Sequence, residues 1–101
     1  MASTHHEDYQ LLVTMLRETR EQDGVSQVDL AAQLGTTQTF ISKVERGERR
    51  LDVIELIELL EALGTKPDAW IESYLTRRKV IHVNHEVKRK TPTFGQGKRA
   101  K

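Results

Sequence analysis

The side chains with the most distinctive chemistry lie in one short stretch, residues 36–47 (TTQTFISKVERG). They are the amide, hydroxyl and ammonium groups of Gln38, Thr39, Ser42 and Lys43. Their spacing of three and four residues places them on one face if the stretch is helical. Such groups near the start of a helix can reach the edges of base pairs, whereas a merely solvated face tends to mix glutamate with lysine. We therefore predict that this face contacts double-stranded DNA.

The four side chains offer different contacts to a base pair. Gln38 is the strongest candidate for base readout, because its amide can both donate to and accept from adenine, and such a bidentate pair discriminates by ~1–3 kcal/mol. Thr39 suits a thymine methyl group or a phosphate, and Lys43 suits guanine or the DNA backbone. For each of them the alternative is a plain solvent-exposed side chain, and for Ser42 the two interpretations are evenly balanced.

Helices must position this face, and the spacing of apolar residues predicts five of them. Ser26, Thr37 and Asp52 are suitable N-caps, and Pro67 suits a first helical turn. The fourth helix carries so many leucines and isoleucines that we expect it to be buried on more of its circumference than a surface helix usually is. We predict a compact all-α domain over residues 1–76. The expected helices cover approximately residues 4–22, 26–34, 37–46, 52–63 and 67–75.

The second and third expected helices have the spacing of a helix-turn-helix. Ala31 is small where two helices must approach closely, and Gly35 follows where the chain needs a left-handed turn. Ile41 and Val44 then fall where they would bury the third helix against the second. An ordinary αα-hairpin shares these features, and the polar face at the start of the third helix favours the helix-turn-helix.

The net charge of +1 conceals a strong asymmetry along the 101 residues. Residues 1–76 carry seven basic and fourteen acidic side chains, a formal charge of −7. Residues 77–101 carry nine basic side chains and one acidic one, a formal charge of +8. We therefore divide the chain into a DNA-binding domain, residues 1–76, and a basic C-terminal tail, residues 77–101. A basic tail of this kind can bind the phosphates of DNA. The alternatives are that it is a solvated segment without a partner, or that it binds a protein.

The tail allows two structural interpretations. Residues 80–87 alternate apolar and polar side chains, which predicts a strand that pairs with its two-fold mate and so contributes to a dimer. Residues 89–101 combine proline, glycine and basic side chains, a composition that resists packing, and disorder of the whole tail is the alternative.

Several functional classes find no support in the sequence. The chain has no cysteine, which excludes disulfides and thiolate metal sites. No apolar stretch approaches the ~20 residues that span a bilayer, and the N-terminus lacks the regions of a signal peptide, so we expect a cytoplasmic, nucleoid-associated protein. His82 and His85 would lie on opposite faces of a strand, and no phosphate loop or nucleophile motif appears. We expect no metal, no cofactor and no enzymatic activity.

The stretch SQVDLAAQLGTTQTFISKVERGERRLDVIELIELLEALG resembles the phage-repressor and Xre/Cro family of helix-turn-helix DNA-binding domains. The resemblance extends back to LRETR and covers about residues 10–75. It implies that the helix matching residues 38–46 enters the major groove, that Gln27 contacts a phosphate, and that arginines after this helix hold the DNA backbone. The candidate DNA-binding residues are Gln27, Thr37, Gln38, Thr39, Ser42, Lys43, Arg46, Arg49 and Arg50.

The resemblance also implies a structural ion pair and a dimer. Arg20 and Glu45 would meet between the first and third helices. Related repressors dimerise so that two recognition helices reach successive major grooves. We therefore expect a homodimeric transcriptional regulator with no membrane partner. We expect it to be a repressor, with an activator as the alternative, because the sign of regulation depends on where the bound dimer lies relative to a promoter. The alternative is an antitoxin or phage regulator of the same fold, which would bind a protein through helix four, helix five or the tail. Candidate dimer residues are Trp70, Ile71 and Tyr74, with Leu75, Ile54 and Ile57 nearby.

Overall fold

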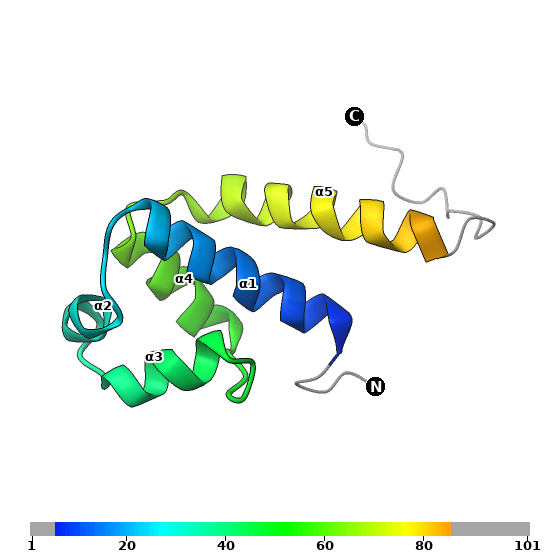
Figure 1. The fold of residues 1–101 in the computed structure, drawn as a ribbon. Helices are drawn as coiled ribbons and strands as arrows, with labels where there is room; N and C mark the ends of the chain where they lie inside the picture. Colours follow the sequence, from blue (N-terminus) through cyan, green and yellow to red (C-terminus); the bar gives the residue numbers. More distant parts are fainter. Residues whose placement is uncertain (1–5, 86–101) are drawn as a thin grey trace.

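The computed structural model describes the backbone of residues 6–85 and the side chains of residues 6–80. Within this range the chain forms five helices and no strand, which confirms the predicted all-α fold. Helix α1 lies along α5, while α2 and α3 lie on the opposite side of α1 from α5 (Figure 1). The helices are α1 (Glu7–Gln22), α2 (Gln27–Leu34), α3 (Gln38–Glu45), α4 (Val53–Ala62) and α5 (Pro67–His85).

Local capping interactions set the starts of α2, α3 and α4 as the sequence predicts, whereas α1 begins later than expected, at Glu7 with His6 as its N-cap. The side chains of Ser26 and Thr37 accept hydrogen bonds from backbone N–H groups three residues later, at 3.0 Å and 3.1 Å. Asp52 forms a full capping box with Glu55. Between α2 and α3 the chain turns at Gly35, whose φ of 69° lies in the left-handed region that glycine adopts without strain. These contacts fix where α3 begins.

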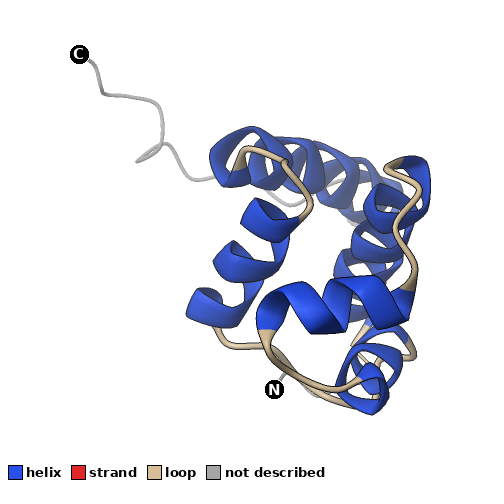
Figure 2. Cartoon of the chain, turned by 90° about the vertical axis from the view of Figure 1, so that its left-hand side faces the viewer, coloured by secondary structure: helices blue, strands red, loops and turns tan. Residues whose placement is uncertain are grey.

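Figure 2 shows how the helices are arranged around one another, and the buried side chains between them form the core that holds the helix-turn-helix in place. Leu16, Leu30, Ile41 and Leu60 are almost completely buried and come from α1, α2, α3 and α4 respectively. Leu30 and Ile41 belong to the same buried cluster as Leu16 and Leu60, and within the domain α2 packs against α4 while α3 packs against α1. The buried side of α3 thereby determines which of its faces points to solvent.

Helix α5 runs further than the sequence predicts, and it corrects the description of the tail. Residues 80–85 are helical, so neither the predicted strand nor disorder describes them. No glycine or proline interrupts residues 68–91, and the β-branched residues cost a helix only a few tenths of a kcal/mol each, about 0.7 at most. Residue 76 therefore lies inside one continuous helix. The remainder of the predicted tail, residues 86–101, lies outside the described part of the chain.

The helical backbone at 80–85 also removes the argument that placed His82 and His85 on opposite faces of a strand. The absence of a metal site at these two histidines is still a prediction.

Helix α4 is less buried than expected. Val53 is 68% exposed and Ile54 is 62% exposed, while Leu56, Leu59 and Leu60 face the core. Val53 and Ile54 lie in the first turn of α4, before the leucines that pack against the core. The apolar stripe of α4 is therefore wider than its buried face. One flank of the helix therefore presents apolar side chains to solvent.

Candidate nucleic-acid interface

The polar face of α3 is exposed because the opposite face is anchored. Ile41 and Val44 are each 1% exposed, and they pack into the two clusters that form the core. The candidate base-contacting side chains lie on the other side of the helix. Gln38, Thr39 and Lys43 are exposed there, and Ser42 is partly exposed.

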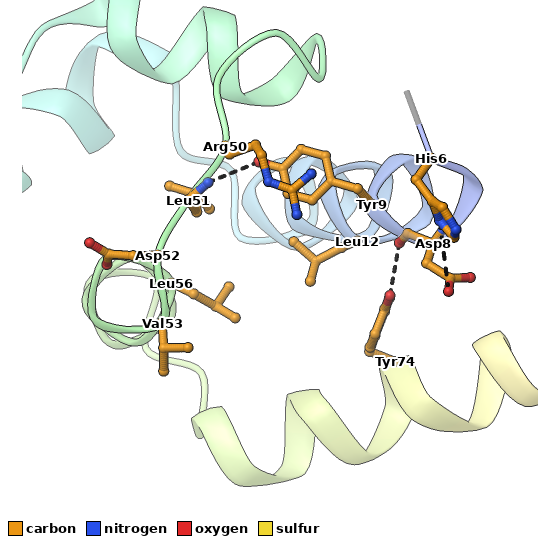
Figure 3. Close-up of a pocket in the computed structure, with 10 residues that line it drawn as sticks. All are labelled: His6, Asp8, Tyr9, Leu12, Arg50, Leu51, Asp52, Val53, Leu56 and Tyr74. Atoms are coloured by element: carbon orange, nitrogen blue, oxygen red, sulfur yellow. Dashed lines mark hydrogen bonds and ion pairs between the residues drawn. The ribbon is translucent and has the colours of Figure 1, made fainter. Parts of the chain in front are cut away.

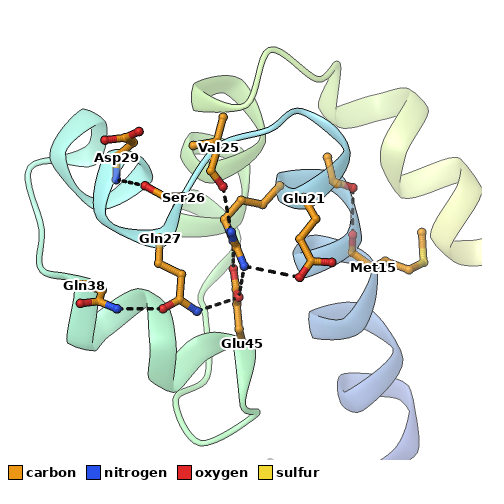
Figure 4. Close-up of polar contacts among 10 residues, drawn as sticks. Met15, Glu21, Val25, Ser26, Gln27, Asp29, Gln38 and Glu45 are labelled. Carbon is orange, nitrogen blue, oxygen red and sulfur yellow. Dashed lines mark hydrogen bonds and ion pairs between the residues drawn. The ribbon is translucent and has the colours of Figure 1, made fainter.

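A chain of hydrogen bonds connects the core to the start of this face (Figure 4). Arg20 donates from Nε to Oε2 of Glu45 at 2.6 Å and from a terminal nitrogen to Oε1 at 2.9 Å. Glu45 Oε1 also accepts from Nε2 of Gln27 at 3.0 Å. Gln27 Oε1 in turn accepts from Nε2 of Gln38 at 3.1 Å. The position of the Gln38 amide is thereby fixed through two intermediate side chains.

The Arg20–Glu45 pair is nearly buried, with side-chain exposures of 11% and 7%. Arg20 also donates to the Val25 carbonyl at 2.8 Å, so its guanidinium joins three segments of the chain. The hydrogen bond to Glu45 raises the pKa of Arg20 above its usual value, although burial acts in the opposite direction. The Arg20–Glu45 pair implied by the family resemblance is therefore present in the structure.

Gln27 begins α2 and makes side-chain contacts that the sequence does not predict, while the phosphate contact implied for it is still a prediction. The resemblance implied a phosphate contact, and in the structure both ends of its amide are engaged, one with Glu45 and one with Gln38. Gln38 donates one amide hydrogen to Gln27 and keeps its carbonyl oxygen and second amide hydrogen for another partner. Gln27 therefore acts on the interface by orienting Gln38.

The end of α3 and the loop that follows it hold their arginines in specific contacts. Arg46 pairs with Glu48 at 3.1 Å and also donates to the Ser42 hydroxyl. The hydrogen bond from Arg46 and the charges of Arg46 and Lys43 lower the pKa of Glu48. Glu48 was not among the predicted site residues, because nothing in the local pattern shows that its side chain turns back toward the helix.

Arg49 and Arg50 each rest on an aromatic ring. The Arg49 guanidinium lies 4.9 Å from the centre of the Phe40 ring, and it also pairs with Glu55 at 3.0 Å. The Arg50 guanidinium lies 4.8 Å from the centre of the Tyr9 ring, and no carboxylate pairs with it among the residues described. Both arrangements are cation–π contacts. The charge of Arg50 therefore remains available to an external anion.

Tyr9 is a second residue that the sequence did not single out. Its hydroxyl donates to the Arg49 carbonyl at 2.7 Å and accepts from the Leu51 N–H at 3.1 Å. These bonds tie the loop after α3 to α1 across 40 and 42 residues of sequence. Tyr9 therefore fixes the loop that carries the three arginines.

Two of the three candidate dimer residues are held within the protomer. Trp70 is 6% exposed and donates from Nε1 to the Thr19 hydroxyl at 2.9 Å. The Tyr74 hydroxyl donates to the Asp8 carbonyl at 2.8 Å, and its ring stacks parallel to that of Trp70. Trp70 is therefore a core residue with little surface of its own, and its part in a dimer is still a prediction. Ile71 is half-buried and packs against the same core.

A pocket of about 400 Å³ lies beside these residues, between α1, the loop after α3, α4 and α5 (Figure 3). Leu12, Leu56 and Val53 form part of its apolar wall, and Tyr74 closes one side. Among the other residues around it are two acidic side chains and two basic ones. These four are His6, Asp8, Arg50 and Asp52.

The geometry of residues 16–70 matches a known domain. Their sequence fits the family model described as Helix-turn-helix (HTH_3), which covers more than half of the chain. The chain belongs to the Xre-type helix-turn-helix family. This family comprises DNA-binding transcriptional regulators and not enzymes, as expected.

Two solved structures show how far the likeness to this helix-turn-helix family extends. An XRE-family like protein from Pseudomonas syringae pv. tomato str. DC3000 is 42% identical, with a TM-score of 0.69, over 72% of this chain and 89% of that one. The restriction-modification controller protein C.AhdI from Aeromonas hydrophila is 31% identical, with a TM-score of 0.60, over 64% of this chain and 98% of that one.

A curated relative, the uncharacterized HTH-type transcriptional regulator y4dJ of Sinorhizobium fredii (strain NBRC 101917 / NGR234), is 42% identical over 45 residues. These residues are 45% of this chain, and the match spans 58% of the length of that relative. Within residues 6–85, none of the helices of this Xre-type domain has the length and apolar character needed to cross a membrane.

Proposed function

We propose that this protein is a sequence-specific transcriptional repressor that places α3 in the major groove of double-stranded DNA. The observation that carries the proposal is the polar face of α3, which is exposed while its first side chain, Gln38, is fixed by hydrogen bonds leading back to a buried ion pair. Side chains that are held in place before binding lose less conformational entropy when they contact a base. A merely solvated face has no need of such a connection.

The proposed contacts follow from the groups that stay available. Gln38 keeps a carbonyl oxygen and an amide hydrogen, the pair that adenine N6 and N7 require. Thr39 and Lys43 are exposed beside it, where they suit a thymine methyl group and guanine or a phosphate, respectively. Arg50 suits a phosphate, because it has a charge that no described carboxylate neutralises.

The proposal includes a homodimer, because one helix-turn-helix contacts only a few base pairs and two-fold related helices about 34 Å apart reach two successive grooves. The 400 Å³ pocket and the exposed side chains of Val53 and Ile54 on α4 support it. Leu75, 51% exposed on α5, adds to the apolar surface. An apolar surface of this kind is where a second protomer would bind. The same surface supports the alternative, in which a different protein occupies it.

Selection of bound duplexes from a random pool tests this proposal. We expect a palindromic consensus whose half-sites are about 10 base pairs apart, because protein symmetry is mirrored in the operator. A pool that stays random after selection would contradict the proposed function. A single, non-palindromic half-site together with capture of a different protein by the α4 surface would favour the alternative.

A further inference from the structure

Contacts at the C-terminal end of α3 indicate a role for Arg46 other than holding a phosphate. Its Nε and one terminal nitrogen donate to the two carboxylate oxygens of Glu48, at 3.1 Å and 3.2 Å. Its other terminal nitrogen donates to the hydroxyl oxygen of Ser42, one turn earlier. The guanidinium therefore bridges Glu48, in the loop, and Ser42, on the base-facing side of the helix.

Ser42 differs in its partners from Thr19 and Thr76, although the Thr19 oxygen also accepts the neutral indole N–H of Trp70. Thr19 and Thr76 donate to the carbonyl groups four residues earlier, at 2.8 Å and 3.0 Å, as helical hydroxyls commonly do. The Ser42 oxygen instead accepts an N–H from a cation. A hydroxyl that accepts such a bond is polarised and becomes a better donor through its own hydrogen.

We propose that Arg46 is a positioning residue, fixed by Glu48, that makes Ser42 a hydrogen-bond donor to a base edge. This inference rests on the proposed function, because it assumes that α3 enters the major groove. A donor at this position selects a base that presents an acceptor there, namely N7 or O6 of guanine, N7 of adenine or O4 of thymine. Cytosine presents its N4 amino donor and is disfavoured.

The charge of Arg46 supports positioning over phosphate binding. Glu48 neutralises it with two hydrogen bonds, so the pair as a whole adds little attraction to the DNA backbone. A phosphate contact would require Arg46 to leave both Glu48 and Ser42. Arg50, in contrast, has no described carboxylate partner, and it provides a matched control for a true phosphate contact.

The test is competition binding of the full-length protein to its selected duplex and to duplexes substituted one base pair at a time, at several salt concentrations. Ser42→Ala identifies the base pair that Ser42 contacts. Arg46→Gln and Glu48→Gln are expected to relax discrimination at that same base pair by about two- to tenfold, the effect of one hydrogen bond. They should leave discrimination at the other base pairs unchanged, because the uncompensated charge that each leaves beside the DNA acts on all duplexes alike. Arg46→Lys, which retains a donor for both partners, should keep most of the discrimination.

The control Arg50→Gln is expected to weaken all duplexes alike and to lower the slope of log K against log salt by about 0.9. Arg46→Gln that weakens all duplexes alike but keeps full discrimination at the Ser42 base pair would overturn the inference, because it would show that Arg46 does not position Ser42. Unchanged discrimination in Ser42→Ala or in Glu48→Gln would overturn it as well. A wild-type protein that binds all duplexes equally would instead overturn the proposed function itself.

Discussion

Glu45 accepts hydrogen bonds from α1 and from α2 and so connects the interior of the domain to its exposed polar face. Its two oxygens bind the guanidinium of Arg20, and one of them also binds the amide of Gln27. A single carboxylate thereby stabilises the packing of α3 against α1 and determines where Gln38 lies. At the scale of the residue, fold and proposed function depend on the same atoms.

This arrangement predicts different effects of two alanine substitutions. Glu45→Ala leaves a nearly buried guanidinium without its partner and should lower the free energy of unfolding by about 3–5 kcal/mol. Gln38→Ala removes an exposed side chain and should change it by less than about 0.5 kcal/mol. Urea unfolding followed by circular dichroism measures both. Equal and small effects would mean that the Arg20–Glu45 pair does not stabilise the domain.

The two tyrosines predict how stability depends on alkaline pH. Burial raises the pKa of Tyr9 and of Tyr74 above the ordinary value of 10.0. A raised pKa in the folded state means that the protonated phenol is favoured there. The resulting stability is fully present below pH 10 and is lost as the pH rises through the folded pKa.

Unfolding free energies measured between pH 8 and pH 11 in the wild type, Tyr9→Phe and Tyr74→Phe test this prediction. Each variant lacks one titrating phenol, and the decrease of stability above pH 10 should therefore be shallower than in the wild type. Identical pH profiles in all three proteins would show that the phenols do not contribute.

At the scale of the element, the predictions that succeeded rest on local signals. Ser26, Thr37 and Asp52 cap the helices because a side-chain oxygen needs only the N–H three residues later. Gly35 turns the chain because its own φ is positive. The buried spacing of Ile41 and Val44 also follows from the helix period, which is why the exposed face of α3 could be predicted.

The parts that the sequence did not predict depend on contacts between distant segments or on weak propensities. Tyr9 meets the loop after α3 only once α1 and α3 have packed, and no local pattern contains that contact. The alternation at 80–87 favoured a strand, but a helix already begun at Pro67 continues unless a breaker stops it. Ion pairs of Arg77 with Glu18 and of Arg78 with Asp8, each at 3.1 Å, also hold α5 against α1.

These ion pairs refine what a C-terminal truncation should do. Because Arg77 and Arg78 already bind carboxylates on α1, the phosphate-binding charge proposed for the tail belongs to residues 86–101, whose six basic side chains and one acidic one give a formal charge of +5. Deleting residues 86–101 should weaken binding to all duplexes. It should also reduce the slope of log K against log salt by about 0.9 for each phosphate that these residues would otherwise neutralise. The preferred sequence should not change.

Electrophoretic mobility shifts at several salt concentrations measure this effect. The double variant Arg77→Gln, Arg78→Gln is the matched control, and it should lower stability slightly while leaving the salt dependence as in the wild type. Unchanged affinity of the truncated protein at every salt concentration would indicate that residues 86–101 contact a protein instead.

At the scale of the whole molecule, the described residues are acidic overall and present most of their exposed large apolar side chains on α4 and α5. Ile54→Asp places a charge on that surface and should convert the proposed dimer into a monomer in sedimentation experiments. Val28→Asp, on α2, changes an equally exposed apolar residue and should leave the dimer intact. A wild-type monomer, both alone and on its selected duplex, would contradict the dimer.

The central claim is that the fixed amide of Gln38 reads a base pair, and duplex selection carried out in parallel with the wild type and with Gln38→Ala tests it most directly. Gln22→Ala, which removes an exposed glutamine at the end of α1, is the control. We expect the wild type and Gln22→Ala to select the same palindrome. Gln38→Ala should lose its preference at one base pair in each half-site, a difference of about 1–3 kcal/mol. The same consensus from all three proteins, or none from the wild type, would contradict the account.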